Sequence, residues 1–485
     1  MVPADPAPSE HLDIVIVGAG LSGIGAAVHL QRRLPRKAYA ILEARGAIGG
    51  TWDLFRYPGI RSDSDMYTLG YAFKPWAGAK AIADGPSIRA YIEDTAREND
   101  IERHIRFDQR LIAARWSTAE ARWTLEIAHG DDTVTQTCNF LLMCSGYYSY
   151  DRAYRPIWPG EAEFAGPIVH PQFWPTDLDT AGKRIVVIGS GATAMTLVPE
   201  LARTAAHVTM LQRSPSYVVS RPSVDRLAGW LRRHLSPRGA YRLTRAKNIL
   251  LGQLFYRLAR RRPDATARRL IDLVRAELGD TFDPVHFTPR YNPWDQRLCL
   301  VPDADLVAAL RSRRATIATG TIERFTRDGI ALSSGETIPA DLIVTATGLH
   351  MEIAGGAKLF VDSAPVDISK TLAYKGLMLS GVPNLGLTFG YTNASWTLKA
   401  DLTSDYFCRL LARMDRRSAR IATPRAPAGT EQAPFLDFTS GYVQRALDTL
   451  PKQGSAHPWR LRQNYLADLA MLRLGRVEEP NLELR

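Results

Sequence analysis

The chain has 485 residues, of which 45% are hydrophobic and 23% charged, and its 61 Lys and Arg exceed its 50 Asp and Glu to give a net charge of +11. This balance is typical of a globular protein of roughly three domains, and it excludes a fibrous chain, a disulfide-stapled miniprotein and a disordered chain. There is neither a run of about 18 apolar residues nor an N-terminal secretory signal. We therefore expect a cytoplasmic protein.

The first predicted elements form a strand, a glycine-rich turn, a helix and a second strand. The apolar strand 13–17 runs into the turn GAGLSG, and the strand within 38–44 ends at Glu43. This order is the βαβ fingerprint of dinucleotide binding, in which the glycines allow a tight turn, close approach to a pyrophosphate and close helix packing. An acid at the end of the second strand suits a ribose without a 2′-phosphate, as in FAD or NAD. The three glycines are Gly18, Gly20 and Gly23.

A second copy of this pattern starts 171 residues later. The strand in RIVVIGSGATA leads into a helix and then into the strand HVTMLQ, after which Arg213 and Ser214 follow. A guanidinium and a hydroxyl at this place suit a 2′-phosphate, so the second site is predicted to prefer NADPH. Glycine turns without any cofactor are the alternative, but two copies in the same context favour nucleotide binding. The three turn positions hold Gly189, Gly191 and Ala194.

The predicted fold class is therefore α/β, with two Rossmann-like dinucleotide-binding domains, one for FAD and one for NADPH. Two later segments agree with it. Residues 340–348 predict an apolar strand that enters a small-residue turn, and residues 390–402 predict a loop entering a helix with Asn393 or Ser395 as its N-cap. A helix N-terminus directed at a flavin would stabilise negative charge on it, whereas an ordinary capped helix is the alternative interpretation.

Residues 226–275 hold an unusual density of positive charge at helical spacing. We interpret this segment as a helical insertion whose basic face is solvated, with weak membrane-surface contact as the alternative. Nucleic acid binding is not expected, because no nucleic-acid-binding motif accompanies the charge. The basic residues are Arg226, Arg232, Arg233, Arg238, Arg242, Arg245, Lys247, Arg257, Arg260, Arg261, Arg262, Arg268, Arg269 and Arg275.

The cysteines carry no motif that would indicate chemistry. None belongs to a CxxC pair or to a pattern of metal ligands, so we expect reduced, partly buried thiols and no metal. A disulfide reductase of similar architecture is excluded, because no redox cysteine pair follows the first nucleotide fold. The four residues are Cys138, Cys144, Cys299 and Cys408.

Two longer motifs narrow the chemistry further. The segment FAGPIVHPQFWP matches the pattern FxGxxxHxxxWP, and GGTWDLFRYPGIRSD matches a second signature of the same family. On these motifs the sequence resembles the Baeyer–Villiger monooxygenases, which are class B flavoprotein monooxygenases, along essentially its whole length. The fingerprint residues are Phe164, Gly166, His170, Trp174 and Pro175, and the second signature includes Gly49, Gly50, Trp52, Tyr57, Pro58, Gly59 and Asp63.

The resemblance implies an enzyme that uses NADPH, FAD and O₂. Such enzymes insert one oxygen atom into a ketone through a C4a-peroxyflavin, giving an ester or lactone, and they can also oxidise sulfides or thioamides. The family pattern implies that Arg297 stabilises the negative charge of the reaction and that Asp63 orients it. It also implies cofactor contacts from Gly50, Trp52 and Asp63, and from Asn393 and Trp396. His170 and Trp174 are expected to hold the domain geometry.

The resemblance also implies a division of the chain. Many family members carry Lys before the active-site Arg, but this chain carries Gln296, so its NADPH preference depends mainly on Arg213 and Ser214. The predicted parts are FAD-binding 1–150, NADPH-binding 151–225, a helical insertion 226–285, NADPH-binding 286–345 and FAD-binding 346–485.

Two other functions are compatible with part of this pattern. A flavin monooxygenase that oxidises sulfur or nitrogen shares both nucleotide folds but normally differs in the linker fingerprint and lacks the arginine of the ketone site. A catalytically idle flavin-binding module docked on a membrane would share the folds and the basic segment. Ketone-stimulated, oxygen-dependent NADPH consumption would separate these alternatives from a Baeyer–Villiger enzyme.

Overall fold

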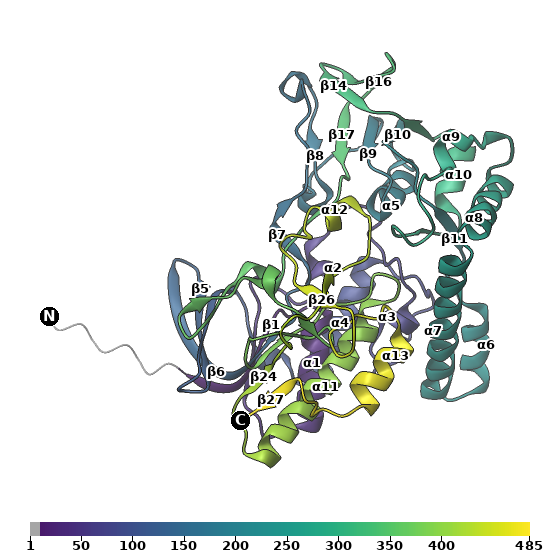
Figure 1. Cartoon of the computed structure of the whole chain (residues 1–485). Helices are drawn as coiled ribbons and strands as arrows, with labels where there is room; N and C mark the ends of the chain where they lie inside the picture. The colour runs from purple at the N-terminus through teal and green to yellow at the C-terminus, as the bar shows by residue number, and fades with distance from the viewer. Residues whose placement is uncertain (1–9) are drawn as a thin grey trace.

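The computed structural model describes residues 10–485, so most of the stretch examined for a secretory signal lies outside the described residues. Two large sheets with helices on their faces dominate the chain (Figure 1). This arrangement confirms the predicted α/β class. No helix within the described residues is long and apolar enough to cross a membrane.

The larger sheet has nine strands and contains the first glycine turn. Its central strand β1 pairs in parallel with β2 on one side and β6 on the other, and β1 is almost fully buried, as expected for a strand covered on both faces. The order is β20-β19-β4-β5-β6-β1-β2-β3, with β23 also beside β6. The strands are β1 (His11–Val17), β2 (Tyr39–Leu42), β3 (Ile105–Arg106), β4 (Gln109–Ser117), β5 (Arg122–His129), β6 (Asp132–Met143), β19 (Lys358–Val361), β20 (Ala364–Pro365) and β23 (Leu385–Leu387).

Helices from both ends of the chain cover this sheet. Helix α1 (Leu21–Arg33) follows β1 directly, and α11 (Trp396–Arg417) packs beside it. Gly18 makes the turn possible, because its φ is +104° and a Cβ there would lie 2.7 Å from the carbonyl oxygen of Cys144. At Gly23 a Cβ would lie 1.8 Å from the carbonyl oxygen of Gly18, so only glycine lets α1 pack this closely.

The smaller sheet has five strands and contains the second glycine turn. All its pairings are parallel, in the order β13-β10-β9-β17-β8, and α5 (Ala192–Leu201) follows the turn after β9. Helix α10 (Asp305–Arg311) packs against α5. The strands are β8 (Ile168–Val169), β9 (Arg184–Ile188), β10 (His207–Gln212), β13 (Ala315–Thr319) and β17 (Leu342–Thr345). A small antiparallel sheet beyond them comprises β14 (Ile322–Thr326), β15 (Gly329–Leu332) and β16 (Thr337–Pro339).

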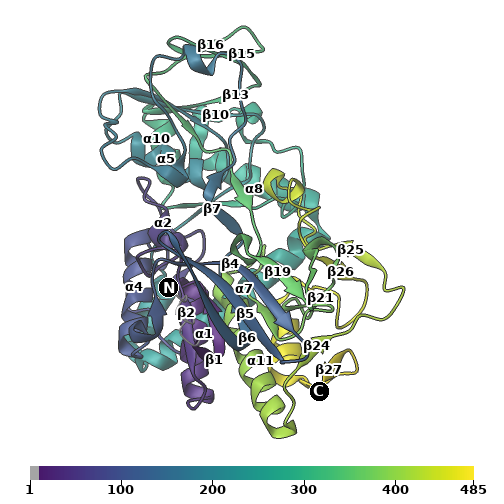
Figure 2. The same cartoon turned by 90° about the vertical axis from the view of Figure 1, so that its left-hand side faces the viewer.

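Two crossing strands connect the halves of the molecule. Strand β7 (Tyr148–Ala153) leaves the large-sheet half and pairs antiparallel with β18 (Leu349–Met351), which returns to it. Figure 2 shows β7 between the two sheets. The remaining helices near the large sheet and at the C-terminal part are α2 (Thr51–Leu54), α3 (Met66–Leu69), α4 (Gly85–Glu98), α12 (Gly441–Gln444) and α13 (Tyr465–Leu469). The other strand pairs are β11 (Val218–Arg221) with β12 (Cys299–Pro302), β21 (Ala373–Tyr374) with β22 (Met378–Leu379), β24 (Ala422–Pro424) with β27 (Leu482–Leu484), and β25 (Gln432–Pro434) with β26 (Lys452–Gly454).

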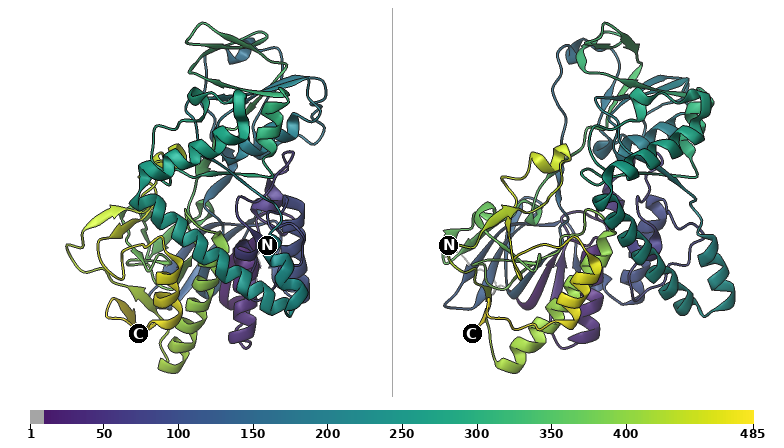
Figure 3. Two further views of the ribbon diagram at one scale, coloured as in Figure 1. Left: turned by 90° about the vertical axis from the view of Figure 1, so that its right-hand side faces the viewer. Right: turned by 45° about the vertical axis from the view of Figure 1, so that its right-hand side comes forward.

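The basic segment forms helices at one side of the molecule. Helices α6 (Arg226–His234) and α7 (Pro237–Arg261) make a hairpin, and α8 (Pro263–Leu278) and α9 (Pro284–Phe287) follow it. The teal hairpin stands out at the edge of the molecule in Figure 3. Helix α7 contacts α3 of the large-sheet half, whereas α8 contacts β11 beside the smaller sheet. The insertion therefore contacts both halves.

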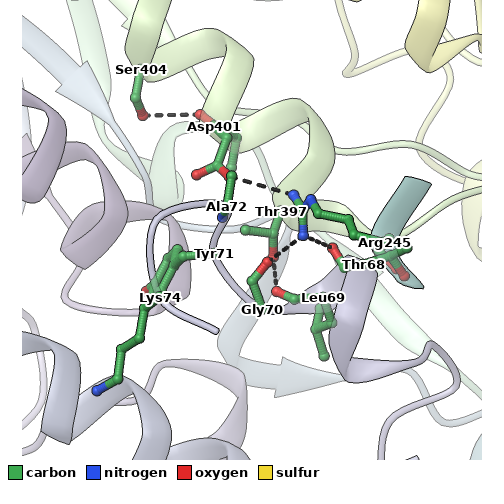
Figure 4. Close-up of polar contacts among 12 residues, drawn as sticks. Thr68, Leu69, Gly70, Tyr71, Ala72, Lys74, Arg245, Thr397, Asp401 and Ser404 are labelled. Atoms are coloured by element: carbon green, nitrogen blue, oxygen red, sulfur yellow. Dashed lines mark hydrogen bonds and ion pairs between the residues drawn. The ribbon is translucent and has the colours of Figure 1, made fainter. Parts of the chain in front are cut away.

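One buried arginine fastens α7 to the large-sheet half (Figure 4). The Nη1 atom of Arg245 donates to the carbonyl oxygens of Tyr67 and Gly70, each at 2.7 Å, around the end of α3. Its Nη2 atom lies 3.6 Å from Asp401 of α11, and the Asp401 carboxylate also accepts from the backbone N–H of Ala72 at 3.0 Å. A single guanidinium thus satisfies the helix-end carbonyls and a largely buried carboxylate.

We predict that Arg245→Met lowers the free energy of unfolding by about 2–4 kcal/mol, because it leaves a largely buried carboxylate without its cation and carbonyls without donors. Arg242→Met, at an exposed position on the same helix, should change it by less than about 0.5 kcal/mol. Urea unfolding followed by circular dichroism measures both. Equal effects in the two variants would contradict the role of Arg245 in holding α7 against α3 and α11.

Candidate active site

A cavity of about 450 Å³ lies between the first glycine turn and the start of α5. The residues that line it come from both halves of the chain, including Ala192 and Thr193 of α5. The predicted site residues that line it are Gly18, Gly20, Glu43, Gly50, Trp52, Asp63, Arg297 and Trp396. Those that do not line it are Gly23, Gly189, Gly191, Ala194, Arg213, Ser214 and Asn393.

One side of this cavity, its floor, is formed by the backbones of two glycines, Gly20 and Gly50, without side chains. Gly20 is the N-cap residue of α1, and a Cβ there would lie 3.4 Å from the Cα of Gly50, so two glycine backbones meet where a side chain would fill the space. The N–H groups of the first turn of α1 have no intrahelical acceptor. An anionic group such as a pyrophosphate fits here, because these N–H groups and the helix dipole both favour negative charge.

Glu43 lies beside this floor with its carboxylate already oriented. Its Oε2 atom accepts from the backbone N–H of Ala19 at 2.7 Å, and its Oε1 atom accepts from that of Arg45 at 3.0 Å. Burial raises the pKa of Glu43 above its ordinary value, against the opposing effect of these two N–H groups. Each oxygen keeps a lone pair for a further donor, so the carboxylate fits a ribose diol.

A buried carboxylate near the cavity was not anticipated from the sequence. Asp53 is 1% exposed and forms ion pairs with three guanidiniums: Arg45, Arg56 at 3.1 Å and Arg89 at 2.9 Å. Burial raises the pKa of Asp53, but the three arginines outweigh it and lower the pKa overall. Because Arg45 also lines the cavity, the cluster leaves excess positive charge close to the place where a pyrophosphate would lie. Asp53 is the last residue of the GGTWD motif, and this motif was the only feature of the sequence that could have indicated the charge cluster.

Arg297 and Asp63 form an ion pair at the wall of the cavity. The Nη1 atom of Arg297 lies 2.6 Å from the Oδ2 atom of Asp63, although 234 residues separate them. Asp63 raises the pKa of Arg297 above its ordinary value, and burial opposes this only in part. The guanidinium therefore stays charged and oriented. The structure thus brings together the two residues that the family pattern implied for catalysis.

The same ion pair also lines a second cavity of about 630 Å³. This cavity lies against α7, and Asn393 and Ser395 line it. The Nδ2 atom of Asn393 donates to the carbonyl oxygen of Gln463 at 2.8 Å, so the structure places Asn393 at the second cavity and not at the first, where a cofactor contact was expected. Ser395 is the N-cap residue of α11 but makes no side-chain capping hydrogen bond.

Trp396, the first residue of α11, links the C-terminal part of the chain to the first glycine turn. Its indole Nε1 donates to Ser22 Oγ of α1 at 2.8 Å, and its ring stacks on Tyr147 with centroids 5.2 Å apart. Both Ser22 and Tyr147 line the first cavity. The start of α11 therefore faces this cavity through an aromatic wall.

The linker fingerprint lies away from the cavities and against the crossing strands. At Gly166 a Cβ would lie 2.3 Å from the carbonyl oxygen of Asp341 and 2.9 Å from the ring of Phe164, which explains the glycine. Phe164 is buried and makes an edge contact with Phe325. Trp174 packs against the core of the smaller-sheet half, and Pro175 follows it. The fingerprint therefore joins structural elements and does not line the cavity.

His170 and Gln172 attach the fingerprint to β7. The Nδ1 atom of His170 accepts from the backbone N–H of Gln172 at 3.1 Å. The buried Gln172 donates through Nε2 to the carbonyl oxygens of Ser149 at 2.8 Å and Tyr150 at 3.0 Å. Gln172 occupies a variable position of the motif, so the sequence did not indicate it. These contacts support a role in domain geometry for His170.

The second glycine turn has the features of the first. Gly189 has a φ of +138°, and a Cβ there would lie 2.3 Å from the carbonyl oxygen of Ala346, whereas a Cβ at Gly191 would meet open space. Ala194 is fully buried under the turn. Beyond β10, Arg213 is exposed and the carbonyl oxygen of Ser214 accepts from Ser190 Oγ at 3.0 Å.

A second cation lies near Arg213. Burial lowers the pKa of Arg445, and the Arg213 guanidinium lowers it further. The Arg445 guanidinium lies over the ring of Tyr154, 3.2 Å from its centroid. Two guanidiniums that repel one another provide a place for a doubly charged anion such as a 2′-phosphate.

Two family models match this chain. The model of the flavin-binding monooxygenase-like family matches residues 83–229, and that of the NAD(P)-binding Rossmann-like domain matches residues 16–77. The FAD-containing monooxygenase EthA of Mycobacterium tuberculosis is 54% identical over 477 residues, covering 98% of each chain. The chain belongs to the EthA group of FAD-containing monooxygenases. The resemblance to flavoprotein monooxygenases that the motifs indicate is therefore confirmed.

More distant relatives and solved structures extend this comparison. The probable FAD-binding monooxygenase AlmA of Acinetobacter baylyi is 46% identical, covering 97% of this chain and 95% of its own. The open crystal structure of cyclohexanone monooxygenase has a TM-score of 0.74 at 18% identity, covering 98% of this chain and all of that one. Oxidized steroid monooxygenase bound to NADP has the same TM-score at 22% identity, covering 98% and 99%. At these identities the structures show a common fold.

We predict that His170 makes the protein less stable in mild acid. Burial lowers the pKa of His170 to about 4, while the unfolded chain takes up the proton near pH 6.5. Between these values the unfolded state binds more protons, so stability falls as the pH falls, by less than about 1.4 kcal/mol per pH unit. In His170→Asn, whose amide oxygen can still accept from Gln172, this part of the slope should vanish. Urea unfolding between pH 4 and 7 measures it, and identical slopes would contradict the assignment.

Proposed function

We propose that this chain is an FAD-dependent, NADPH-using Baeyer–Villiger monooxygenase that inserts one oxygen atom of O₂ into ketones, giving esters or lactones. In the balanced reaction, ketone, O₂, NADPH and a proton give ester, NADP⁺ and water. Sulfides or thioamides are proposed as further substrates, with sulfur accepting the oxygen. The observation that carries the proposal is the Arg297–Asp63 ion pair, which lines both cavities and so stands between cofactor and substrate.

The first cavity fits FAD. The α1 N-terminus would bind its pyrophosphate and Glu43 its ribose, next to the positive charge of the Asp53 cluster. When bound and reduced by NADPH, the flavin supplies the activated oxygen. The start of α11, with Trp396, faces the same space. Relatives in this family are named as FAD-containing, which agrees with this assignment.

NADPH would bind at the second glycine turn, where Gly191 leaves open space and α5 begins. We assign Arg213 and Ser214 to its 2′-phosphate, and Arg445 provides a second positive charge nearby. The oxidised steroid monooxygenase of similar fold was solved with NADP bound. Ala192 and Thr193 of α5 line the first cavity, so the dinucleotide would extend towards the flavin.

The role of Arg297 follows from the charge that the reaction develops. Attack on a ketone places negative charge on the former carbonyl oxygen, and a preorganised cation lowers the free energy of that state most in a site that excludes water. Asp63 holds the guanidinium in one orientation and keeps its charge, as a positioning residue. Sulfur oxidation generates no alkoxide, so it depends less on this cation.

We predict that Arg297→Ala keeps its FAD but forms ester at least about 10²-fold more slowly, the usual effect of removing one preorganised donor. Asp63→Asn should show a weaker form of the same defect. NADPH oxidation with release of hydrogen peroxide should persist, because flavin reduction needs less of this charge. Ester formed per NADPH consumed is the measurement, with bound FAD checked by absorbance.

The outcome also separates the alternatives. An unchanged ester yield in Arg297→Ala would place the chemistry elsewhere. Wild-type enzyme that oxidises sulfides but no ketone would favour a heteroatom monooxygenase with little ketone activity. An idle flavin-binding module would consume no NADPH, but membership of a monooxygenase family favours an active enzyme.

We also propose that the α6–α7 hairpin contacts an anionic lipid surface, which would make the protein peripherally membrane-associated. On α7, four leucines that are 48–63% exposed recur at helical spacing and form one outward stripe: Leu243, Leu250, Leu254 and Leu258. Trp230 of α6 is also half exposed. An apolar stripe with arginines on the same hairpin is typical of helices that lie on membrane surfaces.

The positive charge of residues 226–275 favours an anionic lipid surface as the partner. Residues 226–275 hold fourteen Lys and Arg but two Asp, a net charge of +12, whereas the other 435 residues hold 47 basic and 48 acidic residues. A surface with this charge repels a second copy of itself and attracts anionic headgroups. The stripe would enter the lipid interface while the arginines contact the phosphates.

We predict co-sedimentation with vesicles that contain phosphatidylglycerol at low salt, and release at high salt, where screening weakens the attraction. The double variant Leu250→Ser/Leu254→Ser should bind several-fold more weakly. Leu474→Ser, at a 78% exposed leucine outside the hairpin, should bind like wild type. Absence of binding at low salt, or equal binding by the double variant, would leave the solvated-insertion interpretation.

A further inference from the structure

Three residues that line the second cavity carry buried polar atoms without hydrogen-bond partners. Within residues 10–485, buried side-chain atoms that lack a hydrogen-bond partner include Oε1 of Gln253, Oδ1 of Asn393 and Nε1 of Trp294. All three residues line this one cavity, and they come from three separate segments of the chain. Buried polar atoms are nearly always hydrogen-bonded in folded proteins. Because all three belong to residues of one cavity wall, a molecule bound there is a candidate partner for them.

Gln253 is the most informative of the three. It is 5% exposed although its side chain is an amide, and its Oε1 atom has no hydrogen-bond partner within the described residues. The same cavity is lined by apolar side chains, among them Leu251, Phe255 and Leu298, and also by polar and charged ones, including Arg297. An amide at a fixed place in such a wall provides specificity by direction, because a ligand must present a matching group at that point.

The segment of α7 that carries Gln253 is held in place by the fold. Gln253 follows Arg245 by eight residues on α7, about 12 Å along the helix axis. Since Arg245 binds the end of α3 and Asp401, this wall of the cavity is fixed to the half that carries the first glycine turn. A wall whose backbone is fixed in this way loses little conformational freedom when a ligand binds.

The chemistry of the unpartnered atoms defines the ligand. Two of them, on Gln253 and Asn393, are carbonyl-type oxygens that accept hydrogen bonds, so the ligand must donate. A plain ketone or sulfide has no donor, whereas a hydroxyl or an N–H group has one.

We propose that Gln253 is a specificity-determining residue whose amide binds a hydroxyl or N–H group of the substrate, distant from the atom that accepts oxygen. The preferred substrates are then apolar molecules that carry one such donor, in preference to unsubstituted ketones. This inference rests on the proposed function, because it takes the second cavity as the substrate site next to Arg297. If the Gln253 amide only packs against its neighbours, the enzyme should show no preference for hydroxylated substrates.

The test uses methyl ketones of one chain length with a hydroxyl at successive carbons, together with the unsubstituted ketone. Wild-type holoenzyme should prefer at least one hydroxylated isomer by about tenfold or more in kcat/KM for ester formation. Gln253→Leu should lose this preference, mainly through KM, because the contact is made equally in the ground state. Bound FAD, measured by absorbance, shows whether the variant is folded.

A second variant separates recognition from folding. Gln253→Asn keeps the amide but withdraws it by one methylene, so the preferred hydroxyl position should move to an isomer that reaches further. A residue needed only for packing would not shift that position. As the matched control, Leu254→Gln adds an amide at the next, exposed position, which does not line the cavity, and should keep the wild-type preference.

The outcomes are distinct for the two proposals. If wild-type enzyme forms ester but prefers no hydroxylated isomer, or if Gln253→Leu keeps the preference, this inference is wrong and the proposed function stands. If wild-type enzyme converts no ketone at all, the proposed function itself fails.

Discussion

The ion pair between Arg297 and Asp63 is the interaction on which the rest of the arrangement depends. Its partners come from segments 234 residues apart, one after the first glycine turn and the other shortly before β12. An arginine that lines two cavities can remain in place only if both segments are held in register. Other charged groups hold these segments in position, because they join one helix or loop to another.

These fastening groups share one physical form, a largely buried carboxylate or guanidinium that is fully engaged. Arg245 joins α7 to α3 and α11, and Asp53 gathers three arginines beside the first glycine turn. The Nζ atom of Lys399 on α11 lies 2.7 Å from Asp468, which also accepts from the Tyr391 hydroxyl at 2.7 Å. Removing Arg245 or Lys399 leaves a charged carboxylate buried without its cation, so each of these contacts specifies one arrangement of the elements.

The sequence predicts the parts of this molecule that depend on neighbouring residues. A glycine turn between a strand and a helix is a local pattern, and Gly18, Gly23 and Gly189 are required by contacts that such turns always make. Arg297 and Asp63 lie far apart in the chain, and only a family pattern could connect them. Asp53, Gln172 and Gln253 were not anticipated, because what makes each one notable is burial beside groups from elsewhere in the chain. Asn393 illustrates the same limit, since its contact with Gln463 decides which cavity it lines.

Helix α7 shows why composition alone could not interpret the basic insertion. With about 100° of rotation per residue, Gln253 lies roughly 80° around the helix from Arg245, and Leu254 lies about 180° from it. One side of the helix thus binds the large-sheet half, the next lines the second cavity, and the opposite side carries the exposed leucines. The sequence shows the helical spacing of all three, but only the packing of α7 against α3 and α11 decides which side each residue occupies. Because the contacts of Arg245 fix the rotation of α7, they also fix where the Gln253 amide and the leucine stripe lie. A change that released Arg245 would therefore disturb the cavity wall and the outer surface together.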